Sequence, residues 1–113
     1  MSSRNSAHKK VLEKIARHAS EFCEGNVIST SIEESLIHRG KIIAQPDVTL
    51  RCSNKEIHII EYKGNGNGEH LKRAQDQLNN ASFWYGKYTD LEPDKINLRI
   101  ISGDDPKHKE LFK

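Results

Sequence analysis

Two short runs of strand-forming residues, joined by three polar residues, constrain the fold of this chain more than any other feature. Residues 46–52 alternate apolar and polar side chains, and residues 56–63 are rich in β-branched residues, so both runs are typical of β-strands. The intervening Ser53-Asn54-Lys55 has the length of a tight turn. The segment from Pro46 to Lys63 is therefore predicted to be a β-hairpin.

The turn also predicts the register of this hairpin. If the turn has three residues, counting outward from it places Val48 opposite Ile60 and Asp47 opposite Glu61. Side chains alternate between the two faces of a strand, so Lys63 projects from the same face as Glu61. Two carboxylates and an ammonium group then meet at one end of the hairpin.

This charge cluster predicts a hydrolytic metal site. Like charges directly opposite each other in a sheet are destabilising, with Cβ atoms roughly 5 Å apart, so something should compensate for the two carboxylates. Mg²⁺ typically binds one or two protein carboxylates and fills its remaining positions with water and phosphate oxygens. A lysine beside such an ion can orient the attacking water and offset charge in the transition state. We therefore expect Asp47 and Glu61 to bind Mg²⁺ or Mn²⁺, and Lys63 to assist the water.

Pro46-Asp47, followed after a gap by Glu61-Tyr62-Lys63, resembles the PD-(D/E)xK motif of the restriction-endonuclease-like nuclease superfamily, which includes small archaeal Holliday junction resolvases. The resemblance implies an α/β fold with an αβββαβ core, in which helices flank a mixed β-sheet. It also implies a metal-dependent nuclease that hydrolyses the phosphodiester bonds of DNA, with Asp47, Glu61 and Lys63 as catalytic residues.

Two further site residues are implied by the same resemblance. The superfamily usually has another acidic metal ligand on its first helix, for which Glu13 is the candidate and Glu21 the competitor. Related nucleases often have a glutamine on the helix after the motif, and Gln77 matches that position, with Gln75 as the alternative. A solvated Glu13, paired with Arg17 one helical turn away, is equally compatible with the sequence.

Periodicity predicts the remaining elements. Apolar residues recur at helical spacing from about Ala7 to Glu24, before a glycine, and again from about Glu69 to Tyr88. Asn26–Ser31 and Ile96–Ser102 are predicted strands. Asp105-Pro106 is typical of a helix N-cap followed by proline at the first helical position, which predicts a short C-terminal helix.

The segment before the hairpin is less regular. Ile32–Gly40 fits either a helical turn or a loop, so Glu33 and Glu34 are alternative metal ligands, although an exposed polar loop is the favoured interpretation. Lys41–Ala44 is expected to begin the strand that continues past Pro46. Because proline donates no hydrogen bond to a sheet, an edge, a bulge or a break is expected just before Asp47.

The composition bounds the class of protein. The length of 113 residues predicts one domain spanning residues 1–113, and the net charge of +2 means that a DNA-binding surface must be a local patch. Cys23 and Cys52 are too few for a disulfide framework, and no apolar run is long enough to span a membrane. Met1–Ser6 lacks the apolar region of a secretory signal, so a reduced, cytoplasmic protein is expected.

Three functions are consistent with these features. A DNA-cleaving enzyme is favoured because Asp47, Glu61 and Lys63 are all present; the alternatives are a catalytically inactive nucleic-acid-binding or regulatory subunit with the same fold, and an unrelated small α/β interaction protein. The expected partner is DNA, with RNA as an alternative and no membrane. A junction resolvase needs two active sites and hence a homodimer, for which the only hints are Phe83, Trp84 and Tyr85.

Overall fold

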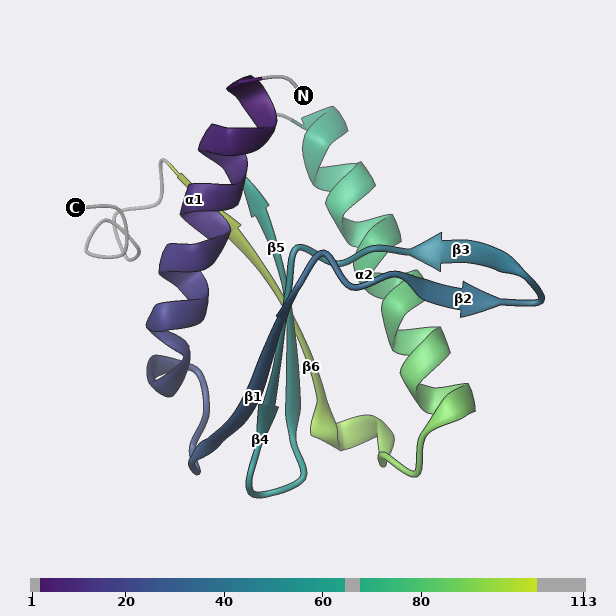
Figure 1. Cartoon of the computed structure of the whole chain (residues 1–113). Coiled ribbons are helices and arrows are strands. Elements are labelled where there is room, and N and C mark those ends of the chain that lie inside the picture. Colours follow the sequence, from purple (N-terminus) through teal and green to yellow (C-terminus); the bar gives the residue numbers. More distant parts are fainter. Residues whose placement is uncertain (1–2, 65–67, 104–113) are drawn as a thin grey trace.

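A four-stranded sheet lies between two helices in the part of the chain that the computed structural model describes, residues 3–64 and 68–103 (Figure 1). The elements follow along the chain as α1 (Ser3–Arg17), the 3₁₀ turn η1 (Ala19–Glu21), β1 (Val27–Ile32), β2 (Leu36–His38), β3 (Lys41–Ala44), β4 (Val48–Cys52), β5 (Ile57–Lys63), α2 (Gly68–Tyr88), the 3₁₀ turn η2 (Pro93–Lys95) and β6 (Ile96–Ser102).

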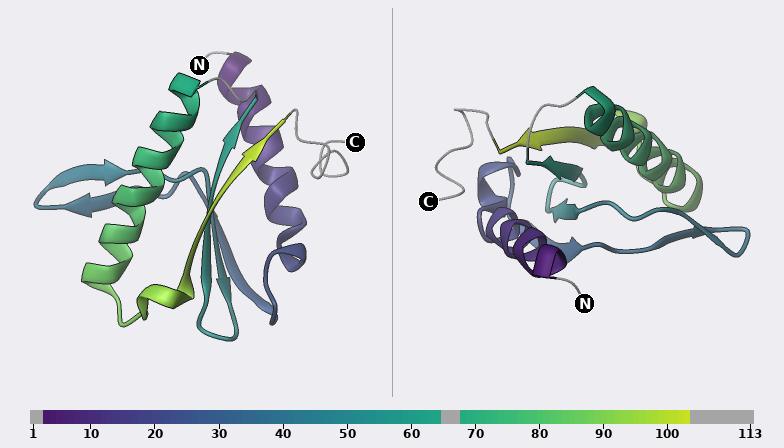
Figure 2. Two further views of the ribbon diagram at one scale, coloured as in Figure 1. Left: turned by 180° about the vertical axis from the view of Figure 1, so that it is seen from behind. Right: turned by 90° about the horizontal axis from the view of Figure 1, so that it is seen from above.

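The central sheet is mixed. Its strand order is β1-β4-β5-β6, with β4 antiparallel to both β1 and β5, and with β6 parallel to β5. The parallel pair requires a crossover connection, and α2 supplies it. Figure 2 shows α1 and α2 on opposite faces of the sheet. The prediction of an α/β fold with a mixed sheet is confirmed at this level.

Each face of the sheet packs against one helix. Leu50 and Ile60 point toward α1 and lie in the same hydrophobic cluster as its Leu12 and Ile15. The alternate residues Ile57 and Ile59 point toward α2, where they pack with the helix residues Ala74, Leu78, Ala81 and Tyr85. Because β5 is covered on both faces, Glu61 at its end is carried into a buried position.

The register of the β4–β5 hairpin matches the prediction. Val48 pairs with Ile60, and the backbone N–H of Cys52 donates to the carbonyl oxygen of Glu56 at 2.9 Å. Lys55 in the turn adopts a positive φ of 68°. Extending this pairing by one residue beyond Val48 brings Asp47 opposite Glu61.

The first helix begins and ends earlier than predicted, whereas α2, β1 and β6 agree closely with the predicted elements. The α-helix ends at Arg17, the ring of the following His18 is hydrogen-bonded to the carbonyl oxygen of Lys14 at 2.8 Å, and the chain continues as η1. α2, β1 and β6 confirm the predicted elements, and the predicted helix at Asp105-Pro106 lies outside the described residues. Neither described helix is long and apolar enough to cross a membrane.

The segment Leu36–Ala44 was not predicted correctly. It is neither a helical turn nor the start of β4 but a separate two-stranded hairpin of β2 and β3, here called the arm. Its turn has positive φ at both central residues, 52° at Arg39 and 78° at Gly40, as a type I′ turn requires. Gln45 and Pro46 separate β3 from β4, which confirms the predicted break before Asp47.

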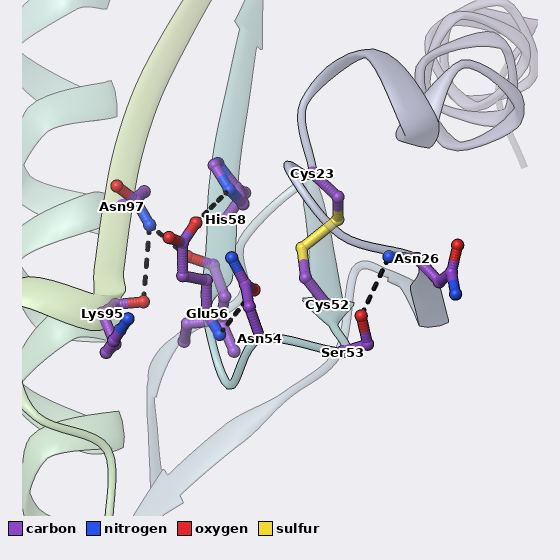
Figure 3. Close-up of a disulfide and its surroundings, with 10 residues drawn as sticks. Cys23, Asn26, Cys52, Ser53, Asn54, Glu56, His58, Lys95 and Asn97 are labelled. Carbon is purple, nitrogen blue, oxygen red and sulfur yellow. Dashed lines mark hydrogen bonds and ion pairs between the residues drawn. A yellow bond between two sulfur atoms is a disulfide. The ribbon is translucent and has the colours of Figure 1, made fainter.

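A disulfide joins Cys23 to Cys52 (Figure 3), so the prediction of two reduced thiols is wrong for this structure. Cys23 follows η1, and Cys52 ends β4 on the sheet face that α1 covers. Packing of the helical segment on that face brings the two Cα atoms to 5.8 Å, within the range that a disulfide bridges. The bond ties the end of the helical segment to the sheet.

Reduction of this disulfide should destabilise the chain by roughly 2–4 kcal/mol, because the bond closes a loop with a sequence separation of 29 and so restricts the unfolded state. Urea denaturation with and without a thiol reductant measures the difference. The double variant Cys23→Ser/Cys52→Ser is the control, since it should be insensitive to the reductant. Equal stability of the oxidised and reduced wild type would show that the bond contributes nothing.

Candidate active site

The candidate site lies where β4 begins and β5 ends. Asp47 directly precedes β4, while Glu61 and Lys63 belong to the last three residues of β5. Asp47 and Glu61 are both buried, with 9% and 3% of their surfaces exposed. The break at Pro46, itself buried, ends β3 and lets Asp47 turn into the sheet.

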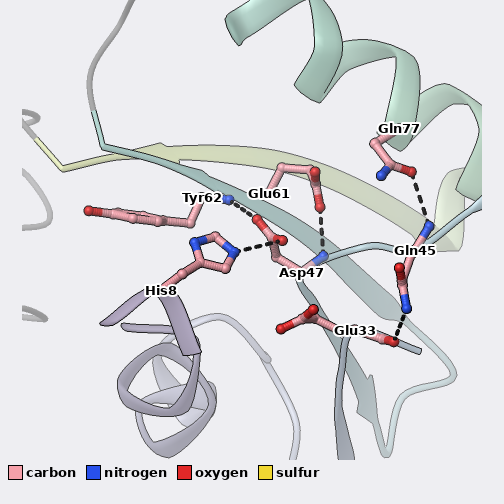
Figure 4. Close-up of polar contacts among 7 residues, drawn as sticks. All are labelled: His8, Glu33, Gln45, Asp47, Glu61, Tyr62 and Gln77. Carbon is pink, nitrogen blue, oxygen red and sulfur yellow. Dashed lines mark hydrogen bonds and ion pairs between the residues drawn. The ribbon is translucent and has the colours of Figure 1, made fainter. Parts of the chain in front are cut away.

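Asp47 and Glu61 are linked through backbone groups (Figure 4). The backbone N–H of Asp47 donates to Glu61 Oε2 at 2.6 Å, and the backbone N–H of Tyr62 donates to Asp47 Oδ2 at 2.8 Å. The two carboxylates therefore occupy neighbouring positions across the hairpin, as the register predicts. Each of them satisfies a main-chain donor on the opposite strand.

The environment of Glu61 disfavours its charged form. Burial is the main cause and the negative charge of Asp47 adds to it, so that the pKa of Glu61 rises to about 8, although the hydrogen bond from Asp47 N–H and the charge of Lys63 act in the opposite direction. Near neutral pH the Glu61 carboxyl group therefore carries a proton. A cation beside the two acids would favour its release.

The stability of the metal-free chain should consequently fall as pH rises. The pKa of Glu61 is 4.5 in the unfolded chain and about 8 in the folded chain, so between these pH values only the folded chain keeps the proton. In this range the free energy of unfolding therefore falls by up to about 1.4 kcal/mol for each pH unit because of this group. Glu61→Gln keeps the hydrogen-bond acceptor and imitates the neutral acid. In chelator the variant should match the wild type at pH 4.5 and exceed it at pH 8, as thermal melts would measure. Parallel pH profiles of the two proteins would contradict the buried-acid assignment.

Lys63 lies on the same face of β5 as Glu61, as predicted. Its side chain is partly buried, and its positive charge lowers the pKa of Glu61 against the stronger effect of burial. The structure thus brings together three of the predicted site residues: Asp47, Glu61 and Lys63.

Among the α1 side chains that the structure describes, those of residues 8–17, His8 reaches the site and the predicted Glu13 does not. His8 Nε2 lies 3.3 Å from Asp47 Oδ1, and its ring is tilted against that of Tyr62 with centroids 6.1 Å apart. Glu13 is exposed and lies roughly 140° further round the helix and about 7.5 Å further along its axis. The resemblance implied a carboxylate on the first helix and gave no reason to expect a histidine there. His8 precedes Leu12 by four residues and Ile15 by seven, so it lies on the same helix face as these apolar residues.

Gln77 contacts the chain that leads into the site. Its Oε1 accepts a hydrogen bond from the backbone N–H of Gln45 at 3.0 Å, and so fixes the break between β3 and Asp47 to α2. Gln75, the alternative, instead donates to Asn79 on the same helix. Gln77 is therefore placed to position Asp47 through the backbone.

The two glutamates before the arm differ in their surroundings. The backbone N–H of Glu33 donates to the carbonyl oxygen of Asp47 at 3.0 Å, and Figure 4 shows the Glu33 side chain beside Asp47. Glu34 instead accepts a hydrogen bond from the Tyr85 hydroxyl at 2.9 Å and pairs with Arg51 at 3.5 Å. Glu33 is therefore the second acidic side chain near Asp47, and Glu34 belongs to a separate cluster.

These donors do not form a ready-made cage. Among the described residues, no group of three or more His, Cys, Asp or Glu side chains is arranged to hold a metal ion. The donor types still suit a hard divalent cation, because Mg²⁺ needs only one or two protein carboxylates besides water. In the structure each carboxylate accepts one backbone hydrogen bond, at Glu61 Oε2 and at Asp47 Oδ2, and Asp47 Oδ1 lies 3.3 Å from His8 Nε2.

Comparison of the chain with protein-family models, with curated proteins and with solved structures finds no match. The functional interpretation therefore depends on the residues of the site and on their geometry.

Proposed function

We propose that the chain is a metal-dependent nuclease of the PD-(D/E)xK type, which hydrolyses phosphodiester bonds of DNA. One observation carries the proposal: Asp47 and a buried Glu61 with raised pKa lie at neighbouring hairpin positions, with Lys63 on the same face. A purely structural hairpin gains nothing from two opposed acids. Perturbed acids beside a lysine are characteristic of catalytic sites.

The topology supports the same assignment. The order α1, β1, β4, β5, α2 and β6, with three antiparallel strands and a fourth parallel one, corresponds to the αβββαβ core that the motif implies. In this interpretation the arm is an insertion between the first and second core strands. The motif residues lie at the start of the second core strand and the end of the third.

In the proposed site Asp47 and Glu61 hold the divalent cation, which would polarise the phosphate and lower the pKa of a bound water. His8 Nε2, beside Asp47, offers an imidazole donor on the α1 side in place of the carboxylate expected at Glu13. Lys63 orients the attacking water and offsets the negative charge that develops on the phosphate oxygens. Gln77 keeps Asp47 in place through Gln45.

Incubation with a panel of end-labelled substrates tests this proposal. The panel contains a four-way junction, a flap, single-stranded DNA, linear duplex DNA and a matched RNA, each with Mg²⁺, Mn²⁺ or chelator. Cleavage of at least one DNA that depends on the metal, and that is lost in Glu61→Gln, is the expected result. Metal-independent cleavage, or equal cleavage by Glu61→Gln, would refute the assignment.

A second candidate function is a nucleic-acid-binding subunit without turnover. It is favoured by the hydrogen bonds of both carboxylates to backbone N–H groups, which give each acid a partner in the metal-free chain. Calorimetry with Mn²⁺ separates the two functions. DNA binding together with no metal binding and no cleavage would support the subunit over the enzyme.

A further inference from the structure

The arm formed by β2 and β3 is a positively charged projection of the fold. Asp and Glu account for 16 of the 113 residues, yet none occurs from Ser35 to Pro46, where Arg39 lies in the turn and Lys41 directly follows it. Both of these side chains are exposed, and within the described residues neither makes an ion pair. Figures 1 and 2 show the tip extending beyond α2.

The arm is held in one orientation by α2. Trp84 Nε1 donates to the carbonyl oxygen of Ile37 at 2.9 Å, and His38 Nδ1 lies 2.6 Å from the Tyr88 hydroxyl. The His38 ring also meets Phe83 edge-on, with centroids 5.5 Å apart. The two cations are therefore presented by an anchored hairpin, so little additional ordering is required when they meet a ligand.

The arm continues directly from the candidate site. Two residues, Gln45 and Pro46, connect β3 to Asp47. A cleft of about 460 Å³ lies between the arm and α2, and its lining includes the cationic Arg73 and the acidic Asp76. Lys41 and Arg39 precede Asp47 by six and eight residues, which are spans of at most about 22 Å and about 29 Å. Successive phosphates of one DNA strand are about 3.4 Å apart along the helix axis.

We propose that the arm binds the backbone of duplex DNA beside the cleaved bond, with Arg39 and Lys41 on phosphates within about eight base pairs of it. The inference rests on the proposed function and names the form of its substrate, a duplex segment flanking the site. The exposed cross-strand pair Ile37 and Ile42 gives the arm an apolar face between its cations and the body, suited to the sugar edge of a groove.

Charge favours DNA over a second copy of the chain as the occupant. Two arms placed together would bring four cations into proximity without an acidic residue on either arm. A stable dimer also buries about 800 Å² on each partner, contributed by roughly 20–30 residues. The half-exposed apolar side chains here are four: Ile37, Ile42, Phe83 and Tyr88.

Binding of a fluorescent 20-base-pair duplex in chelator, where no cleavage occurs, tests the inference. The double variant Arg39→Ala/Lys41→Ala should lower the slope of log affinity against log salt by about 1.8, about 0.9 for each lost phosphate contact, and weaken binding at 0.1 M salt at least tenfold. The matched control Arg17→Ala/Lys55→Ala removes the same charge at the other end of the sheet and should keep the wild-type slope. Melting curves of all three proteins should coincide, because the four side chains are exposed.

The outcomes separate this inference from the proposed function. If the wild type cleaves DNA but the arm variant has the wild-type slope, the arm inference is wrong and the nuclease assignment stands. If the wild type binds no DNA in chelator and cleaves none of the DNA substrates with metal, both are wrong. The arm is a self-association surface instead if two results are found together. Sedimentation would show a wild-type dimer that the variant Ile37→Ser/Ile42→Ser cannot form, and Arg39→Ala/Lys41→Ala would bind DNA as the wild type does.

Discussion

Replacing Lys63 with alanine should lower the rate of DNA cleavage by at least about 100-fold while leaving metal affinity nearly unchanged. Lys63 shares a face of β5 with Glu61, and its charge already acts on that carboxyl group. In the proposed site the ammonium group acts on the water and the phosphate, not on the ion, so its loss affects the transition state and not metal binding. Groups aimed at developing charge or at proton transfer typically contribute factors of about 10² to 10⁴.

Single-turnover cleavage of the best substrate and calorimetry with Mn²⁺ measure the two quantities separately. Lys55→Ala is the control, because Lys55 lies in the turn at the opposite end of the same hairpin and carries the same charge. Cleavage by Lys63→Ala close to the wild-type rate would remove Lys63 from the mechanism. A large loss of Mn²⁺ affinity in this variant would instead make Lys63 a determinant of the metal site.

Asp47→Asn should abolish metal-dependent cleavage and reverse the order of stability between wild type and variant when metal is added. In chelator at pH 9, above the pKa of Glu61 of about 8, both acids are charged, and removing one of them should stabilise the variant by up to about 1 kcal/mol. Asparagine keeps an oxygen that can accept the hydrogen bond from Tyr62 N–H, so the fold should survive.

With metal the wild type should be the more stable protein. An ion that binds only the folded chain stabilises it by about 2.7 kcal/mol at one hundred times its Kd, and the variant should lose most of this gain. Thermal melts of both proteins at pH 9, with chelator and with Mg²⁺ or Mn²⁺, measure the reversal. At pH 6, where Glu61 is protonated, the difference in chelator should shrink.

A variant that melts far below the wild type in chelator would assign Asp47 a structural role. The bonds from Tyr62 N–H and to His8 would then be its main function. Glu33→Gln is the matched control, because Glu33 is the other acid beside Asp47. Its backbone N–H, and not its carboxylate, makes the hydrogen bond to the carbonyl oxygen of Asp47. Glu33→Gln should leave the melting temperature in chelator unchanged. It should change the stabilisation by metal by only a small amount.

The sequence alone determined the parts of the site that follow from local geometry. Alternation with period two and a three-residue turn suffice to place Val48 opposite Ile60, and hence Asp47 opposite Glu61 with Lys63 on the same face. Helical spacing likewise identified α2 and its buried residues, among them Leu78 and the others of its apolar stripe. These features depend on residues close together in the chain. The regular alternation of side chains along a strand or helix is therefore enough to predict them.

The tertiary structure alone decided the features that depend on distant segments. His8 meets Asp47 only because α1 packs with its first turns near the start of β4, and Cys23 meets Cys52 at the other end of that strand. The arm was missed because its turn places Arg39 at a positive φ, a conformation that arginine rarely adopts and that tertiary contacts with Trp84 support. Finally, the sequence gives no sign that the pKa of Glu61 is unusual, because glutamate is mostly found on protein surfaces. In the structure both faces of β5 are covered, which removes the carboxyl group of Glu61 from water and raises its pKa to about 8.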